Sequence, residues 1–270
     1  MTITKIVGIV NLTRDSFSDG GKYLEPEAAV THARRLVADG ADIVDLGAES
    51  THPDSEDVSA EEEIARLTPV IVRLKADGIC VSVDTYKPTV IRHVLRLGVD
   101  FINDITALRD SDSVAAVRDA SAKLILMHGR ASAARAERSE ADPVTLVDDI
   151  IRFFEQRIAG LAASGIARER LIIDPGMGFF LGSNPEASLA VLRHLDRLRT
   201  LNVPILISTS RKSFIGALLG RRGVPRPVAE RAAGTLMTEI WAAQHGAAYI
   251  RTHEARALRD ALILLDGLGA

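Results

Sequence analysis

The chain has 270 residues, 47% of them hydrophobic and 26% charged, with a formal net charge of −3. These globular values exclude extensive disorder, and the slightly acidic balance argues against a general nucleic-acid-binding protein, which would carry a basic face. The one cysteine, Cys80, excludes an intrachain disulfide and fits a reducing compartment. No export signal and no apolar run of about 18 residues is evident, so we expect a cytoplasmic protein without a membrane span.

Short runs rich in Val and Ile alternate with longer amphipathic segments along the chain. The length and composition of these runs are typical of buried parallel strands. The predicted strands are residues 5–12, 42–49, 80–86, 100–108, 123–128, 171–179, 204–210 and 247–253. Eight strand–helix units in a chain of this length predict a single-domain (β/α)8 TIM barrel, an α/β fold, over residues 1–270. A doubly wound open sheet is the structural alternative.

Three of the predicted helices have clear signals. Ser59, with Glu62 three residues later, has the form of a capping box at the start of a helix over 59–77. Residues 143–165 carry apolar side chains at helical spacing. Asn184 precedes Pro185, a typical cap followed by a first-turn proline, and predicts a helix over 185–200.

Polar residues stand at or near the ends of all eight predicted strands. Along the chain they are Asn11, Asp45, Asp84, Asn103 with Asp104, His128, Asp174, the run Ser210–Lys212, and the run Arg251–His253. In a (β/α)8 barrel the catalytic groups lie at the carboxyl ends of the strands. Any one of these residues could instead cap a helix or close a turn. Their occurrence at every strand favours a common site.

One group of these residues suits a flat heterocycle. Asp84, Asn103 and Asp174 offer carboxylates and an amide, which can pair with a ring edge that presents N–H and NH2 groups.

A second group suits a phosphorylated ligand. Lys212, Arg251 and His253 come from the last two units, whose loops commonly form a phosphate site in these barrels. Asn11 could give a neutral oxygen ligand to Mg2+, which takes its remaining ligands from phosphate and water. The sequence therefore predicts a heterocycle joined to phosphate or pyrophosphate, with Mg2+ as the cofactor.

The same residues, in this order, resemble the dihydropteroate synthase family of folate biosynthesis. Each fragment is weak alone, but the ordered series is specific and covers essentially the whole chain. The fragments are Gly8–Thr13 with Asp15–Gly21, Glu49–Pro53, Val83–Thr85, Ile102–Asp104, Leu126–His128, Asp174–Phe179 and Ser210–Ser213.

The resemblance implies a transferase with two small-molecule substrates. The family joins 6-hydroxymethyl-7,8-dihydropterin pyrophosphate to p-aminobenzoate, giving 7,8-dihydropteroate and pyrophosphate. Mg2+-assisted loss of pyrophosphate would precede attack by the amine, and Lys212, Asp84 and Asp174 would be the catalytic residues. A homodimer built on the later helices is also implied, with Trp241 as a candidate anchor; the alternative is that Trp241 only packs on the barrel.

The resemblance also assigns the substrate-binding residues. The pterin would be held by Asp84, Asn103, Asp174 and Lys212, and Met127 would be a further substrate-binding residue. Pyrophosphate would be held by Arg251 and His253, and Mg2+ by Asn11. The p-aminobenzoate site would include Ser50, Thr51, Pro53, Phe179 and Ser213.

Two loops depart from the usual family pattern. His52 and Asp54 replace an arginine and a glycine, and Phe180 and Leu181 replace a glycine and a lysine. Both loops resemble those of sulfonamide-resistant, mobile-element members of the family, so we expect weaker sulfonamide inhibition. Lineage-specific loop packing is the alternative explanation for Phe180.

Two other functions are compatible with a pterin pocket. One is a methyltransferase barrel that passes a folate methyl group to a corrinoid protein; the other is a catalytically silent pterin-binding paralogue. The methyltransferase needs no pyrophosphate site, so the runs Ser210–Lys212 and Arg251–His253 favour the synthase. The complete set of pterin and pyrophosphate groups argues against a silent paralogue.

Overall fold

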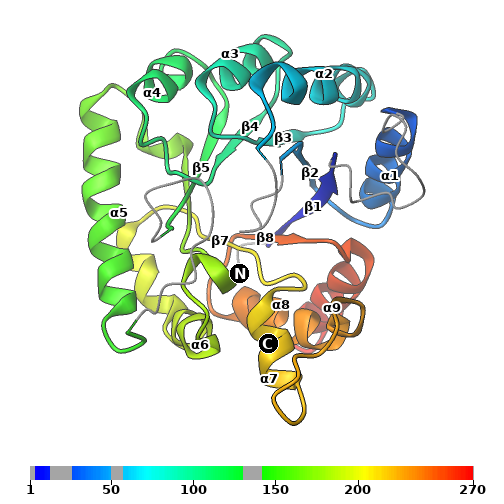
Figure 1. Cartoon of the computed structure of the whole chain (residues 1–270), viewed down its shortest axis with the longest axis vertical. Helices are drawn as coiled ribbons and strands as arrows, with labels where there is room; N and C mark the ends of the chain where they lie inside the picture. The colour runs from blue at the N-terminus through cyan, green and yellow to red at the C-terminus, as the bar shows by residue number, and fades with distance from the viewer. Residues whose placement is uncertain (1–3, 13–25, 50–56, 130–141, 270) are drawn as a thin grey trace.

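The computed structural model describes residues 4–12, 26–49, 57–129 and 142–269. Within them, eight strands form one parallel sheet in the order β6-β5-β4-β3-β2-β1-β8-β7. A bridge between Ile173 and Ile205 brings the edges of β6 and β7 together, so the sheet is a nearly closed barrel (Figure 1). This confirms the predicted TIM barrel and excludes the open sheet. The strands are β1 Lys5–Asn11, β2 Ile43–Gly47, β3 Val81–Asp84, β4 Phe101–Asp104, β5 Lys123–Met127, β6 Leu171–Asp174, β7 Leu206–Ile207 and β8 Tyr249–Thr252.

Helices follow one another around the outside of the barrel (Figure 1). They are α1 Pro26–Ala38, α2 Ala60–Ala76, α3 Pro88–Arg96, α4 Ser111–Val117, α5 Leu146–Ala163, α6 Pro185–Arg193, α7 Ser213–Leu219, α8 Ala232–Gln244 and α9 Ala255–Gly267. Short 3-10 helices lie at η1 Arg168–Arg170, η2 Gly178–Phe180, η3 Leu195–Leu201 and η4 Val228–Glu230. Helices packed around the sheet bury its outer face, as this architecture requires.

The predicted helix starts are confirmed. Ser59 Oγ accepts a hydrogen bond from the Glu62 N–H at 3.1 Å, and Asn184 Oδ1 accepts one from the Glu186 N–H at 2.9 Å. Each bond satisfies a backbone donor that has no partner inside its helix. The predicted helix over 185–200 is divided at His194 into α6 and η3.

Three predicted strands were too long, because the backbone turns away where their polar ends begin. After β4, Ala107 and Leu108 adopt left-handed φ angles of 58° and 56°. After β6, Gly176 has φ 75°, and a Cβ there would lie 2.4 Å from the His128 carbonyl oxygen, so only glycine fits. After β7, the chain makes a turn before α7.

A small apolar cluster fills the barrel interior. It consists of Val7, Ile43, Phe101, Ile125, Ile172, Leu206 and Tyr249, with Cys80 partly buried against it. Burial raises the pKa of the Cys80 thiol to about 11, so it is an unreactive thiol at neutral pH and serves in packing.

The same cluster determines which strand residues face the site. Side chains two apart on a strand share a face, so Asp45 follows Ile43, Asn103 follows Phe101 and Asp174 follows Ile172 on the inner face of the barrel. The inner face thus changes from apolar to polar toward the carboxyl ends of the strands, where an active site is expected.

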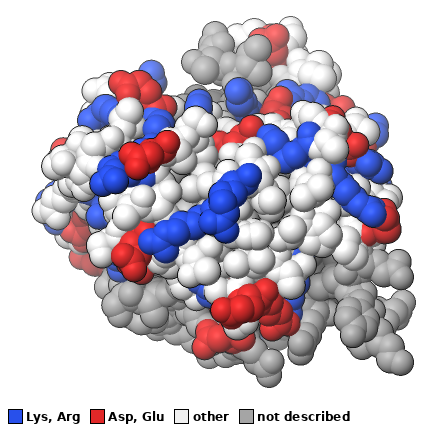
Figure 2. All heavy atoms as spheres, turned by 90° about the horizontal axis from the view of Figure 1, so that it is seen from above, with Lys and Arg blue, Asp and Glu red and all other residues white. Residues whose placement is uncertain are grey.

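The outer surface is mixed in charge. On the face that Figure 2 shows, basic side chains lie among acidic and uncharged ones. No helix in the described ranges is both long and apolar enough to cross a membrane.

Candidate active site

Arg251 lies at the centre of the polar layer. From β8, its Nε donates to Asp45 Oδ2 at 2.6 Å and its Nη2 donates to Asp84 Oδ2 at 3.0 Å. Asn103 Nδ2 also donates to Asp45 Oδ2, at 3.3 Å. One guanidinium therefore joins the ends of β2, β3 and β8 and brings three predicted site residues, Asp84, Asn103 and Arg251, into one hydrogen-bonded network.

Asp45 was noted in the sequence but not assigned to the site. It is fully buried, and its Oδ1 has no hydrogen-bond partner among the described residues. The signal was available: an aspartate between Val44 and Leu46 in a buried apolar run needs a partner or a ligand. Its second oxygen is an open acceptor at the base of the site.

The carboxyl of Asp84 has an unusual environment. Burial raises its pKa to about 7; the Arg251 guanidinium opposes the rise, and the nearby Asp45 adds to it. Asp84 can therefore gain or lose a proton near neutral pH when a ligand binds or when Arg251 pairs with another anion.

Asp174 occupies the end of β6 and is 6% exposed. Its Oδ1 accepts the Gly176 N–H at 2.8 Å, which holds the carboxyl in the turn after the strand. Burial raises its pKa to about 6, while the Gly176 hydrogen bond and the Lys212 and Arg251 charges lower it. Met127, buried on β5, pairs with Asp174 in the sheet register and forms an apolar surface beside it.

Lys212 precedes α7 and lies near an aromatic ring and within the electrostatic influence of two carboxylates. Burial and Arg251 lower its pKa, whereas Asp174 and Asp84 raise it. Its Nζ lies 5.2 Å from the centre of the Phe180 ring, within cation–π distance. Phe180 thus contacts a predicted catalytic residue.

Gly178 permits this close arrangement. A Cβ there would lie 3.3 Å from Ser213 Oγ and 3.4 Å from Lys212 Cδ, and its φ is 65°. The structure therefore places Ser213 and the half-buried Phe179 at the same junction of η2 and α7 as Lys212.

His253 follows β8 and bonds to Ser210, which follows β7. Ser210 Oγ lies 2.8 Å from His253 Nδ1 and accepts the His253 backbone N–H at 3.2 Å. Burial, together with the charges of Arg211 and Arg251, lowers the pKa of His253 to about 3, so the ring is neutral at physiological pH.

Asn11 is exposed at the carboxyl end of β1. A methyl group at Gly47 would lie 4.0 Å from both Asn11 Oδ1 and Asp84 Oδ2, so the two side chains flank the same glycine. Within the described ranges no three His, Cys, Asp or Glu side chains form a metal-binding group. A single neutral oxygen suits Mg2+, which completes its shell with phosphate and water, better than a metal held by the protein alone.

The predicted residues Ser50, Thr51 and Pro53 lie outside the described residues. The positions that flank them are firmly held. Lys87 Nζ donates to Glu49 Oε2 at 2.6 Å, to the Val58 carbonyl at 2.6 Å and to the buried Glu63 at 2.9 Å. Burial alone would lower the pKa of Lys87, but its bonds to Glu49 and Glu63 raise it, so this tie persists at neutral pH.

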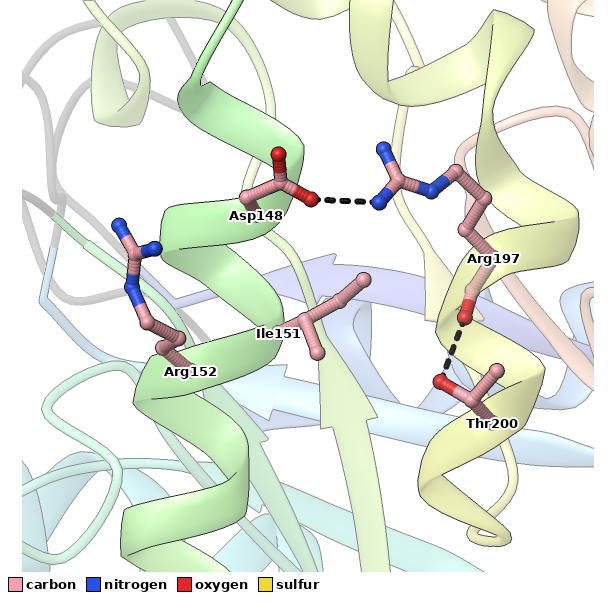
Figure 3. A pocket seen from close by; sticks show the side chains of 5 residues that line it. All are labelled: Asp148, Ile151, Arg152, Arg197 and Thr200. Atoms are coloured by element: carbon pink, nitrogen blue, oxygen red, sulfur yellow. Dashed lines mark hydrogen bonds and ion pairs between the residues drawn. The ribbon is translucent and has the colours of Figure 1, made fainter.

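A surface pocket between α5 and η3 is separate from this site (Figure 3). It is lined by Asp148, Ile151, Arg152, Arg197 and Thr200. Arg197 pairs with Asp148 at 2.5 Å, and Arg152 pairs with Asp149. Its cations are already matched by carboxylates, and none of the strand-end residues lines it.

Comparisons with known proteins agree on one family. Residues 7–253 match the family described as pterin binding enzyme. The chain is 50% identical over 264 residues to dihydropteroate synthase type-2 from Escherichia coli, covering 97% of this chain and 95% of that protein. A Xanthomonas albilineans dihydropteroate synthase solved with 4-aminobenzoic acid has 41% identity and a TM-score of 0.90, covering 99% of this chain and 93% of that one. The same enzyme in complex with 7,8-dihydropteroate has 39% identity and a TM-score of 0.86, covering 99% and 94%.

Replacing Arg251 by Met tests the central ion pairs. The change leaves two buried carboxylates without their cation, so we expect the free energy of unfolding to fall by about 3–5 kcal/mol near pH 8. Burial raises the pKa of Asp84 to about 7 against the opposing charge of Arg251, so the variant should hold this proton still more tightly. At pH 5 Asp84 is then protonated in both proteins, and the loss should be smaller. Urea unfolding at both pH values measures this loss of stability.

Arg193→Met, which breaks an exposed pair with Glu186, is the matched control and should cost about 1 kcal/mol or less. A loss for Arg251→Met that does not vary with pH would contradict this account.

Proposed function

The chain belongs to the dihydropteroate synthase family, within the pterin-binding enzymes, and from this premise we propose that it condenses 6-hydroxymethyl-7,8-dihydropterin pyrophosphate with p-aminobenzoate. The observation that carries the proposal is that one barrel mouth holds both an acidic acceptor set and a cationic set. Asp45, Asp84 and Asp174 form the first, and Arg251 and Lys212 lie among them. A related enzyme has been solved with 4-aminobenzoic acid and with 7,8-dihydropteroate, which supports the same substrates here.

The acidic set would bind the pterin. Carboxylates accept the ring N–H and NH2 donors, and the Asn103 amide adds directed hydrogen bonds in a largely dry pocket. When pyrophosphate leaves, positive charge spreads from the exocyclic methylene over the electron-rich ring. Asp84 and Asp174 would stabilise that charge, which is electrostatic catalysis by pre-positioned groups.

The cationic set would bind pyrophosphate. Arg251 can exchange a carboxylate partner for a phosphate oxygen, and His253 lies beside it at the end of β8. Asn11 would hold Mg2+, which when bound supplies positive charge to the leaving group. The protein needs no nucleophile of its own, in agreement with the inert Cys80.

The second substrate would lie near Lys212, between η2 and the start of α7. Ser213 and Phe179 are at this junction, and residues 50–53 are assigned to the same site by the family resemblance. Holding the amine against the ring turns a bimolecular attack into an effectively unimolecular one. Lys212 would serve both parts of the site, because the charges of Asp84 and Asp174 act on it and the ring of Phe180 lies 5.2 Å from its Nζ.

A homodimer is part of the proposal. Apolar side chains are exposed along α7, the segment after it and α8: Leu218, Leu219, Val224, Val228, Met237 and Trp241. Trp241 is 36% exposed, and its Nε1 donates to the Leu192 carbonyl at 2.9 Å. It therefore packs on α6 and still offers surface to a partner, so the two interpretations of this residue are compatible.

Pyrophosphate release tests the function directly. With dihydropterin pyrophosphate and Mg2+, we expect release that depends on p-aminobenzoate and yields 7,8-dihydropteroate. Lys212→Ala should reduce turnover roughly 10²-fold, because it removes a charge that stabilises the reacting groups. Lys123→Ala, at the opposite end of β5, is the control and should remain active. A protein that binds pterin without releasing pyrophosphate would be a silent paralogue, and methyl transfer to a corrinoid protein would identify the alternative barrel.

Asp174→Asn tests the pterin pocket. The amide presents a donor where the ring presents its own, so pterin affinity should fall by about 10²-fold. The pKa of Asp174 in the empty site is about 6, and binding needs the carboxylate. Wild-type affinity should therefore rise as the pH increases from 5 to 7 and then level off, whereas the variant should show no such rise. Calorimetry at several pH values measures the pterin affinity of both proteins.

Glu239→Gln is the control, because Glu239 is a buried carboxyl on α8 whose pKa is also raised by burial; this variant should bind pterin like the wild type. Equal affinities for wild type and Asp174→Asn would contradict the assignment.

We also propose weak inhibition by sulfonamides. Phe180 contacts Lys212, and a methyl group at Gly129 would lie 3.8 Å from its ring, so the ring narrows the region assigned to p-aminobenzoate. A sulfonamide has a bulkier tetrahedral group where the substrate has a flat carboxylate, so an added wall excludes the drug more than the substrate. Phe180→Gly should strengthen sulfonamide inhibition by roughly 10–200-fold and change the KM for p-aminobenzoate little.

Phe180→Tyr keeps the bulk of the side chain and should stay insensitive to sulfonamides. If Phe180→Gly leaves the inhibition constant unchanged, Phe180 serves only loop packing.

A further inference from the structure

Ser210 and His253 form a contact that the substrate assignments leave unexplained. Both residues follow neighbouring strands, β7 and β8, which are paired in the sheet. Ser210 is 5% exposed. Its hydroxyl oxygen makes two contacts with the same residue, one with the His253 backbone N–H at 3.2 Å and one with the ring Nδ1 at 2.8 Å.

Counting donors and acceptors at this hydroxyl decides the tautomer of the ring. The backbone N–H can only donate, so Ser210 Oγ accepts there. The hydroxyl proton then needs an acceptor, because burying it unpaired carries a desolvation penalty. In the described part of the chain, the acceptor within reach is His253 Nδ1. Nδ1 is therefore the lone-pair nitrogen, and the ring proton is on Nε2.

The charges around the ring keep it neutral. Arg211 and Lys212 approach from the segment after β7, Arg251 from β8 and His32 from α1, and each of them disfavours a second proton on His253. A neutral ring in this tautomer presents Nε2–H as a single donor. Because the ring lies among cations, that donor is suited to an anionic oxygen.

We propose that Ser210 is a positioning residue that holds His253 as a neutral Nε2–H donor to the pyrophosphate end of the substrate. The proposal rests on the proposed synthase function. In the reaction, the C–O bond electrons leave with the pyrophosphate oxygen while the proton stays on Nε2. His253 then stabilises the leaving group by a hydrogen bond and does not act as a general acid.

Nitrogen-15 NMR of the full-length protein tests the tautomer without any substrate. With labelled histidine, the spectrum of His253, assigned with a His253→Gln variant, should show a lone-pair Nδ1 and a protonated Nε2. The pattern should not change between pH 5 and pH 8. A protonated Nδ1, or a ring that titrates in this range, would overturn the proposal.

A substitution tests the role of the hydroxyl. Ser210→Ala removes the group that fixes the ring, so the spectrum should change to mixed tautomers. The KM for dihydropterin pyrophosphate should rise about tenfold, the effect of losing one oriented hydrogen bond to a charged group, while the KM for p-aminobenzoate stays unchanged. Ser210→Thr keeps the hydroxyl and should restore both the spectrum and the KM. Ser208→Ala, at another buried serine of the same segment, is the matched control.

The results separate this proposal from the synthase function. An unchanged spectrum in Ser210→Ala, or an equal rise in both KM values, would overturn the positioning role even in an active enzyme. Conversely, a wild-type protein without turnover would contradict the proposed function, while the NMR spectrum would still decide the tautomer.

Discussion

The burial of Arg251 between Asp45 and Asp84 is the constraint on which the rest of the site depends. Removing a guanidinium and two carboxylates from water costs several kcal/mol for each ion, and the cost is offset only when the geometry is nearly ideal. The rigid register of β1 provides that geometry, because β2 and β8 flank it on either side. The barrel thus holds opposite charges close together in a mouth that is largely shielded from water.

Under the proposed function, this arrangement would favour one molecule with two chemically different ends over either part alone. Pterin donors would satisfy acceptors such as the unpartnered Asp45 Oδ1. A polyanion would compete for Arg251, and the carboxylates it releases would then need the ring donors. Each end of the proposed substrate would therefore favour binding of the other, because a lone pterin or a lone pyrophosphate would leave charges unmatched.

Much of this could be predicted from the sequence, because strand periodicity is local. The β-branched runs, their polar ends and the caps at Ser59 and Asn184 can all be seen within a few residues. The pairing of Asp45 with Arg251 could not, since it joins residues 206 positions apart and depends on closure of the barrel. Nor could the left-handed turn at Ala107 and Leu108, because neither residue type favours it. Arg157 holds that turn from α5 by donating to both carbonyl groups, a tertiary interaction that no local pattern indicates.

The aromatic ring of Phe180 lies within cation–π distance of Lys212. Burial lowers the pKa of Lys212 and so disfavours its ammonium form. A glycine at position 180 would leave the space beside the Lys212 ammonium group to water or ligand. The face of the Phe180 ring instead attracts this cation and partly replaces the hydration that Lys212 loses on burial. A Cβ at Gly176 would lie 3.4 Å from the Cβ of Phe180, so the start of the Phe180 side chain lies against the turn after β6. In the proposed synthase, the same ring would therefore narrow the p-aminobenzoate region and favour the charged form of Lys212, so that discrimination against a larger ligand would cost little catalysis.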